Sequence, residues 1–172
     1  RGRQVKKSIL VILLFATVLA AERSTAFELV RDGLPMCFIV LSDSAGPAER
    51  FAAQELSDHV EKMSGAALPV RTMDYDDIPS AAKAVVIGDA GWRNDSRFDG
   101  VHEDMLRLGE QGYIMRSVEG SEPGILVIAG ASPRGTLYGV YDFLRQIGVR
   151  WYTPEITRYP SLKTIDPGDV DV

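Results

Sequence analysis

The residues best placed to do chemistry lie on one predicted helix near the end of the chain. Arg134, Tyr138 and Asp142 are spaced four residues apart, so on a helix they form one ladder of a cation, a hydroxyl and a carboxylate. Tyr141 lies beside this ladder. These groups are suited to contact with a polar partner surface. The alternative is that the tyrosine hydroxyls bond to local main-chain groups at the edge of the core, since half-buried tyrosines usually find a local partner.

The turn before this helix superficially resembles a phosphate-binding loop, since residues 130–135 read Gly-Ala-Ser-Pro-Arg-Gly. However, no Lys-Ser/Thr pair follows Gly135, and the glycine spacing of a dinucleotide-binding fold is missing. Pro133 also lacks an N–H donor that a phosphate would use. Ser132 and Pro133 are instead typical of a helix N-cap and a first helical position. We therefore predict a structural turn and no cofactor, the alternative being an anion held by the positive end of the helix and Arg134.

The histidines, the acidic loop and the cysteine do not form a metal-binding pattern. His102 lacks the second histidine of a zinc-protease motif, and residues 74–77 lack the spacing and glycine of a calcium loop. His59 has charged neighbours and is predicted to be solvated. Cys37 lies in an apolar segment, which predicts a buried structural thiol. No metal site is predicted, and a single cysteine excludes an internal disulfide framework.

Charge and the first residues bear on partners and location. The net charge of −5 and the pI near 5.1 argue against nucleic-acid binding, which needs a basic face. Lys6 and Lys7 precede an apolar run over 9–16, and small residues follow up to Ala26. This pattern predicts a secretory signal peptide over residues 1–26 and hence an exported, periplasmic or extracellular protein. The run is shorter than the ~20 residues that span a bilayer, so we expect membrane contact only through this leader.

Hydrophobic periodicity predicts the elements that position these residues. Helices are predicted over 47–63, capped by Ser44, and over 133–147, with a short one near 103–108. Strands are predicted over 27–31, 36–41, 68–72, 84–88, 113–118, 125–129, 149–152 and 162–165, the first two joined as a hairpin. Gly135 and Gly139 leave a groove where a sheet is able to approach closely. Together these elements predict an α+β fold, a mixed sheet with two main helices on one face, the other face being solvated or packed on something else.

The helical segment also carries a resemblance to a known family. Residues 132–144 read SPRGTLYGVYDFL, and residues 148–154 read GVRWYTP. This signature resembles the accessory domain that precedes the catalytic barrel in family 67 α-glucuronidases, a kind of domain also known from β-hexosaminidases. Segments 32–41, 51–70 and 85–88 support the resemblance. It implies an accessory domain over 27–166, with residues 167–172 beginning a linker to a C-terminal domain.

The resemblance implies a function as well as a fold. It points to the non-catalytic N-terminal domain of an exported, α-glucuronidase-like glycoside hydrolase in polysaccharide breakdown. The partners would be the C-terminal catalytic barrel of the same polypeptide and, through it, carbohydrate. A (β/α)8 barrel needs ~250 residues, so this segment alone is expected to be inactive. Asp142 and Glu155 are only formal candidates for a glycosidase carboxylate pair, because no spacing argument selects them.

We predict a domain interface or cleft rim at six residues: Arg134, Tyr138, Tyr141, Asp142, Trp151 and Tyr152. We also expect an exposed apolar patch near Trp151, Tyr152, Ile156 and Tyr159, since large exposed patches usually mark interfaces. The alternative function is a free-standing carbohydrate-binding module. In that case surface aromatics, named here as Trp92, Trp151, Tyr152 and Tyr159, would stack on sugar rings.

Overall fold

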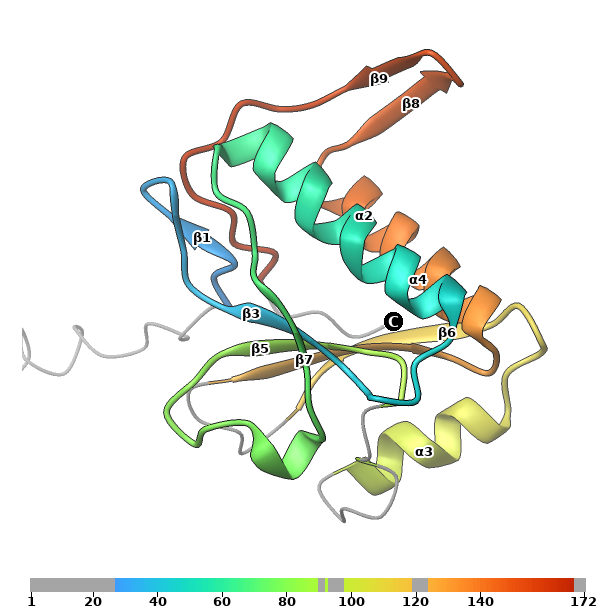
Figure 1. Cartoon of the computed structure of the whole chain (residues 1–172). Coiled ribbons are helices and arrows are strands. Elements are labelled where there is room, and N and C mark those ends of the chain that lie inside the picture. The colour runs from blue at the N-terminus through green and yellow to red at the C-terminus, as the bar shows by residue number, and fades with distance from the viewer. Residues whose placement is uncertain (1–26, 90–91, 93–97, 119–123, 169–172) are drawn as a thin grey trace, which may run out of the picture.

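A five-stranded sheet lies at the centre of the molecule, with helices on both of its faces (Figure 1). The computed structural model describes residues 27–89, 92, 98–118 and 124–168. The predicted leader, residues 119–123 and the last four residues of the predicted linker lie outside this range.

The sheet has the strand order β4-β3-β5-β7-β6. Its strands are β3 (Phe38–Leu41), β4 (Val70–Thr72), β5 (Ala84–Ile87), β6 (Tyr113–Ser117) and β7 (Ile125–Gly130). The first four positions pair in parallel, whereas β6 pairs antiparallel with β7. Every residue of β3, β5 and β7 is buried, as expected for strands covered on both faces. The predicted mixed sheet is confirmed.

Two long helices cover one face, as predicted. They are α2 (Pro47–Ser64) and α4 (Pro133–Gln146), which lie side by side over the sheet (Figure 1). The opposite face packs against α3 (Asp99–Leu106) and the short helix η1 (Tyr75–Asp77). From the sequence, this second face is expected to be either solvated or packed on something else. The structure covers it with the chain's own residues.

The opening hairpin is shorter than predicted. Strand β1 (Val30–Arg31) pairs with β2 (Leu34–Pro35) across Asp32 and Gly33, which adopt φ values of 51° and 76°. The segment after it does not extend the hairpin but enters the central sheet as β3. Strand pairing explains the difference, because in the central sheet β3 is hydrogen-bonded to a parallel strand on each side. The predicted last strand is reduced to one isolated bridge between Val30 and Ile165.

The predicted N-cap residue is correct for α4 and wrong for α2. Ser132 accepts a hydrogen bond from the Gly135 N–H at 3.1 Å, so the predicted N-cap is confirmed. The N-cap of α2 is Gly46 rather than Ser44, whose hydroxyl lies 2.8 Å from that of Ser42. The Glu49 carboxylate completes this start, because it accepts a 2.8 Å hydrogen bond from the Gly46 N–H.

Candidate functional site

A two-stranded hairpin lies beyond the C-terminal ends of α2 and α4 (Figure 1). It consists of β8 (Arg150–Thr153) and β9 (Ile156–Arg158). Trp151 joins it to the helices, with ring centroids 5.4 Å from Tyr141 and 5.6 Å from His59. The hairpin therefore brings together Tyr141 and Trp151, two of the residues predicted to form an interface.

The hairpin is seated over a polar centre that joins the two helices. The Tyr141 hydroxyl donates a 2.6 Å hydrogen bond to Glu55 Oε2 on α2, and His59 Nδ1 lies 2.8 Å from the Glu55 carbonyl oxygen. His59 is only 5 % exposed and also packs against the Tyr159 ring at 5.6 Å, so its predicted solvation is wrong. Burial, followed by the bond to the Glu55 carboxylate, raises the pKa of Tyr141 well above its ordinary value.

Sequence reasoning missed Glu55 and His59 as parts of this centre. The signal that was present is their spacing of four residues, which places them on one helix face next to the buried Leu56 and Val60. It was overlooked because charged residues adjoin His59 in the sequence. The hairpin that covers His59 is about ninety residues away in the chain.

Replacing Tyr141 with phenylalanine is expected to cost about 1.5 kcal/mol of unfolding free energy at neutral pH, because a hydrogen bond to a carboxylate is lost. The raised pKa fixes the pH dependence. The contribution of the hydroxyl is fully present below the ordinary tyrosine pKa of about 10 and is lost as pH rises towards the higher folded-state value. Urea unfolding of both proteins at neutral pH and above pH ~10 measures this difference.

Tyr138→Phe provides the matched control, since Tyr138 lies on the same helix with 40 % of its surface exposed. We expect little change in this variant at either pH. Equal losses in the two variants, or a difference that grows at high pH, would show that the bond between Tyr141 and Glu55 does not stabilise the helix pair.

The predicted ladder of Arg134, Tyr138 and Asp142 is not linked by hydrogen bonds among its members, because Asp142 binds other residues. Asp142 is bound by Arg145, Gln146 and Tyr113 rather than by Tyr138. Partial burial acts to raise the pKa of Asp142, but these three hydrogen bonds outweigh it and hold the pKa below its ordinary value. Arg134 and Tyr138 lie on the exposed side of α4. The Tyr141 hydroxyl is bonded within the domain, but to the side chain of the distant Glu55 and not to a local main-chain group.

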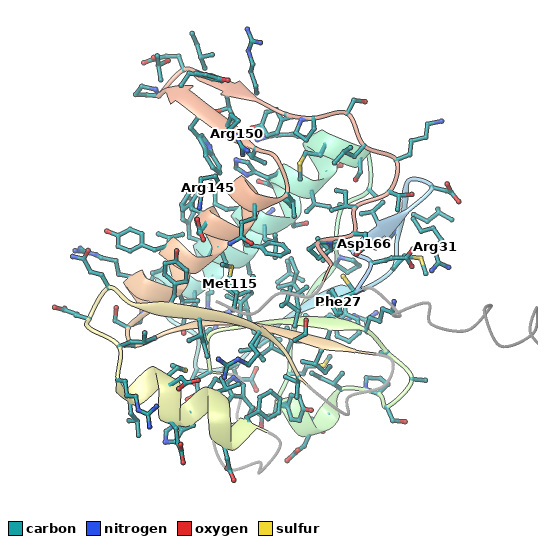
Figure 2. All side chains as sticks on the ribbon, turned by 180° about the vertical axis from the view of Figure 1, so that it is seen from behind. Phe27, Arg31, Met115, Arg145, Arg150 and Asp166 are labelled. Atoms are coloured by element: carbon teal, nitrogen blue, oxygen red, sulfur yellow. The ribbon has the colours of Figure 1, made fainter. Side chains whose placement is uncertain are left out.

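The exposed side of the hairpin carries a compact group of side chains, which we term the outward face: Arg150, Tyr152, Ile156 and Arg158. Tyr152 is 65 % and Ile156 51 % exposed. Arg150 lies next to Arg145 at the end of α4 (Figure 2). The expected apolar patch is thus present in part. Tyr159 does not belong to it, because its ring packs against the core instead.

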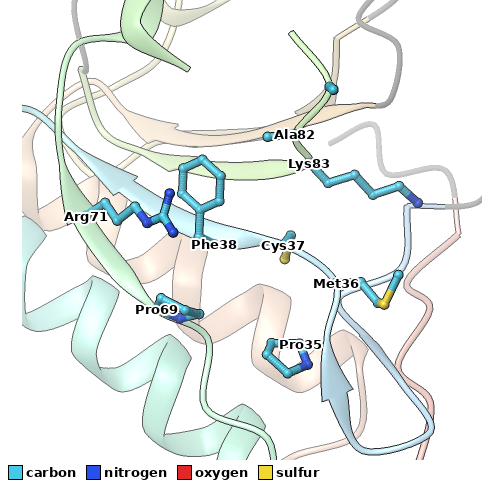
Figure 3. Close-up of a pocket in the computed structure, with 9 residues that line it drawn as sticks. Pro35, Met36, Cys37, Phe38, Pro69, Arg71, Ala82 and Lys83 are labelled. Carbon is cyan, nitrogen blue, oxygen red and sulfur yellow. The ribbon is translucent and has the colours of Figure 1, made fainter. Parts of the chain in front are cut away.

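A separate groove of about 390 Å³ lies where β3, β4 and β5 begin (Figure 3). Arg71 stands over the Phe38 ring at 4.4 Å on one side, and Lys83 lies on another. Cys37 forms part of the wall, yet it is 6 % exposed, and burial raises the pKa of its thiol to about 12. The predicted buried structural thiol is confirmed.

Trp92 is excluded as a sugar-stacking residue. It has no exposed surface, and its indole N–H donates a 2.9 Å hydrogen bond to the Gly88 carbonyl. Within the described residues no three His, Cys, Asp or Glu side chains are grouped to hold a metal ion. In the same part of the chain, no helix is long and apolar enough to cross a membrane.

Comparison with known proteins identifies the fold. The family "Glycosyl hydrolase family 67 N-terminus" matches residues 30–143. A solved structure of a family GH115 4-O-methyl-α-glucuronidase, described as specific for decorated arabinogalactans, is similar with 25 % identity and a TM-score of 0.57. The similarity covers 81 % of this chain but only 17 % of that enzyme. No curated protein matches the sequence. The matched region contains the whole five-stranded sheet, all of α2 and most of α4, and the chain belongs to the family of glycosyl hydrolase family 67 N-terminal domains.

Proposed function

We propose that this chain is the non-catalytic N-terminal domain of an exported, α-glucuronidase-type glycoside hydrolase acting in polysaccharide breakdown. The main observation that supports this function is the family match over residues 30–143. The similar GH115 enzyme supports it, because there the corresponding fold is a small part of a much longer α-glucuronidase. Export is proposed from the leader pattern in residues 1–26.

The arrangement of side chains supports a bracing role rather than catalysis. Of the two formal carboxylate candidates, Asp142 is held by three neighbouring groups, and Glu155 accepts a 3.1 Å hydrogen bond from Thr153 at the exposed hairpin turn. Glycoside hydrolysis needs two carboxylates that face each other across a sugar. The hairpin, by contrast, offers an exposed surface that suits contact with a catalytic domain.

The purified chain is expected to release no nitrophenol from aryl glucuronides or aryl N-acetylhexosaminides above the blank rate. The complete product of the gene is expected to hydrolyse the aryl glucuronide. The spectrophotometric assay therefore compares the two proteins at equal concentration. Turnover by the chain alone that is abolished in Asp142→Asn would overturn the accessory role.

The second candidate is a carbohydrate-binding module, and the exposure of Tyr152 and the partial exposure of Trp151 favour it. Trp92 is buried and Tyr159 is only partly exposed, however, so the other two are the only well-exposed members of the four proposed stacking residues. This loss makes the accessory role the better supported function.

A further inference from the structure

We propose that the outward face of the β8–β9 hairpin docks onto a carboxylate-bearing surface of the catalytic domain in the same polypeptide. The inference rests on the proposed function and deepens it, because it names the docking residues and the chemistry of the partner surface. Three features of the hairpin support it: its register, its unbalanced charge and its exposed side chains.

The register places two arginines directly opposite each other. Arg150 pairs with Arg158 across the ladder, and Trp151 pairs with Thr157 in the next position. Because side chains alternate along a strand, Arg150 leaves β8 on the side opposite Trp151, and its guanidinium group reaches the main-chain carbonyl of Arg145 at the end of α4. Tyr152 lies on the outward side too, since the Arg158 guanidinium stands 5.8 Å from the centre of its ring.

No carboxylate among the described residues pairs with the charge of this face. Like charges that face each other across a strand pair destabilise the pair. Neither Arg150 nor Arg158 forms an ion pair with any described side chain, although Arg150 bonds to the main-chain carbonyls of Arg145 and Val149. This cationic face is carried by a chain of net charge −5. A carboxylate placed between the two guanidinium groups would turn repulsion into paired, bidentate contacts.

The exposed side chains favour a protein partner over a sugar. Tyrosine and arginine are the residues enriched at protein–protein hot spots. Ile156, 51 % exposed, adds an aliphatic branch that is suited to burial but offers no flat ring for stacking. A two-stranded hairpin is also only marginally stable alone. Here the helices support one side, through Trp151, and the outward side remains bare.

The continuity of the polypeptide identifies that protein. In the similar GH115 enzyme the matched region is 17 % of the chain, so the fold occurs there together with much additional protein. Eight residues separate the hairpin from the predicted linker, so a domain that follows this linker would have a high effective concentration at this surface. The predicted occupant is therefore the following catalytic domain.

Arg158→Glu is the most informative variant. The Arg150 side chain also bonds a main-chain carbonyl at the end of α4, whereas no such bond is formed by the Arg158 side chain within the described residues. The chain and the separately produced remainder of the gene product are mixed, and their affinity is measured by calorimetry at low and high salt. We expect Arg158→Glu to weaken association about tenfold or more at low salt and to reduce the salt dependence. The affinity of the Arg158→Lys variant should lie between those of the wild type and Arg158→Glu. Circular dichroism verifies that each variant remains folded.

Arg107→Glu is the matched control. Its side chain is 75 % exposed, next to α3 on the opposite face of the sheet, and undergoes the same change of charge. We expect its affinity to stay within about twofold of the wild type, as for charges remote from an interface. Equal weakening by both variants, or none by Arg158→Glu, would overturn the inference.

A sugar partner is tested with polygalacturonate and the chain alone. Saturable heat that disappears in Arg158→Glu would identify an acidic glycan as the occupant and overturn the protein-docking proposal. Failure of the proposed function is a separate result. It would appear as a complete gene product without glycosidase activity, whereas an active enzyme whose domains associate independently of Arg158 contradicts only this inference.

Discussion

Gly130→Ala is expected to destabilise the domain by about 3 kcal/mol or more, because the added methyl group has no space. Gly130 ends β7, and a Cβ there would overlap the main-chain nitrogen of Thr136 and the carbonyl carbon of Gly135 in the first turn of α4. Backbone atoms cannot rotate away as a side chain does, so the strand and the helix must separate. The Gly130 N–H also donates a 3.0 Å hydrogen bond to the Thr136 hydroxyl, which such a shift would break.

Chemical denaturation monitored by circular dichroism measures this loss, with Gly109→Ala as the control. A Cβ at Gly109 would meet no atom within 4 Å, so that variant should remain within about 0.5 kcal/mol of the wild type. A Gly130→Ala protein as stable as the control would show that α4 is not held against the end of β7 by this close approach.

Trp92→Ala is expected to cost about 3–5 kcal/mol, the range for deleting a large buried aromatic side chain. Trp92 stacks on Phe98 with ring centroids 5.3 Å apart, and Phe98 meets Tyr75 edge-on at 4.6 Å. These rings fill the layer between the sheet and α3, so the cavity would open where α3 is attached.

Trp151→Ala is the comparison that separates the roles of the two tryptophans. Trp151 is 39 % exposed, and its loss is expected to cost only about 1–2 kcal/mol, in proportion to the smaller apolar area it buries. Thermal and urea unfolding of both variants give the ranking. If Trp151→Ala were the more damaging, the hairpin, and not the layer under α3, would limit the stability of the domain.

Features encoded by neighbouring residues were predictable from the sequence. The start of α4 is an example, since Ser132 and Pro133 define it through bonds and angles within one turn. Gly148, just after the helix, adopts the positive φ of 112° that favours glycine. The close approach at Gly135 followed from the same local pattern.

Features decided by distant residues could not be predicted. The bond between Glu55 and Tyr141 joins residues 86 positions apart, and the sequence around either one gives no sign of the other. The carbohydrate-binding alternative places Trp92 on the surface, yet its side chain is fully buried and its ring stacks on that of Phe98. The parallel pairing of β3 likewise depends on strands that are far along the chain.

The bridge between Val30 and Ile165 governs when this domain is able to finish folding as it is synthesised. Leu29 and Val30 line the core, and their main chain bonds to Ile165 at 2.9 Å in both directions, from the Leu29 N–H and to the Val30 carbonyl. The sheet strands and α4 emerge from the ribosome before Ile165 does, and domains generally fold as units in the order of synthesis. Strand β1 must therefore wait for Ile165 before these hydrogen bonds form. By then the β8–β9 hairpin has already been synthesised.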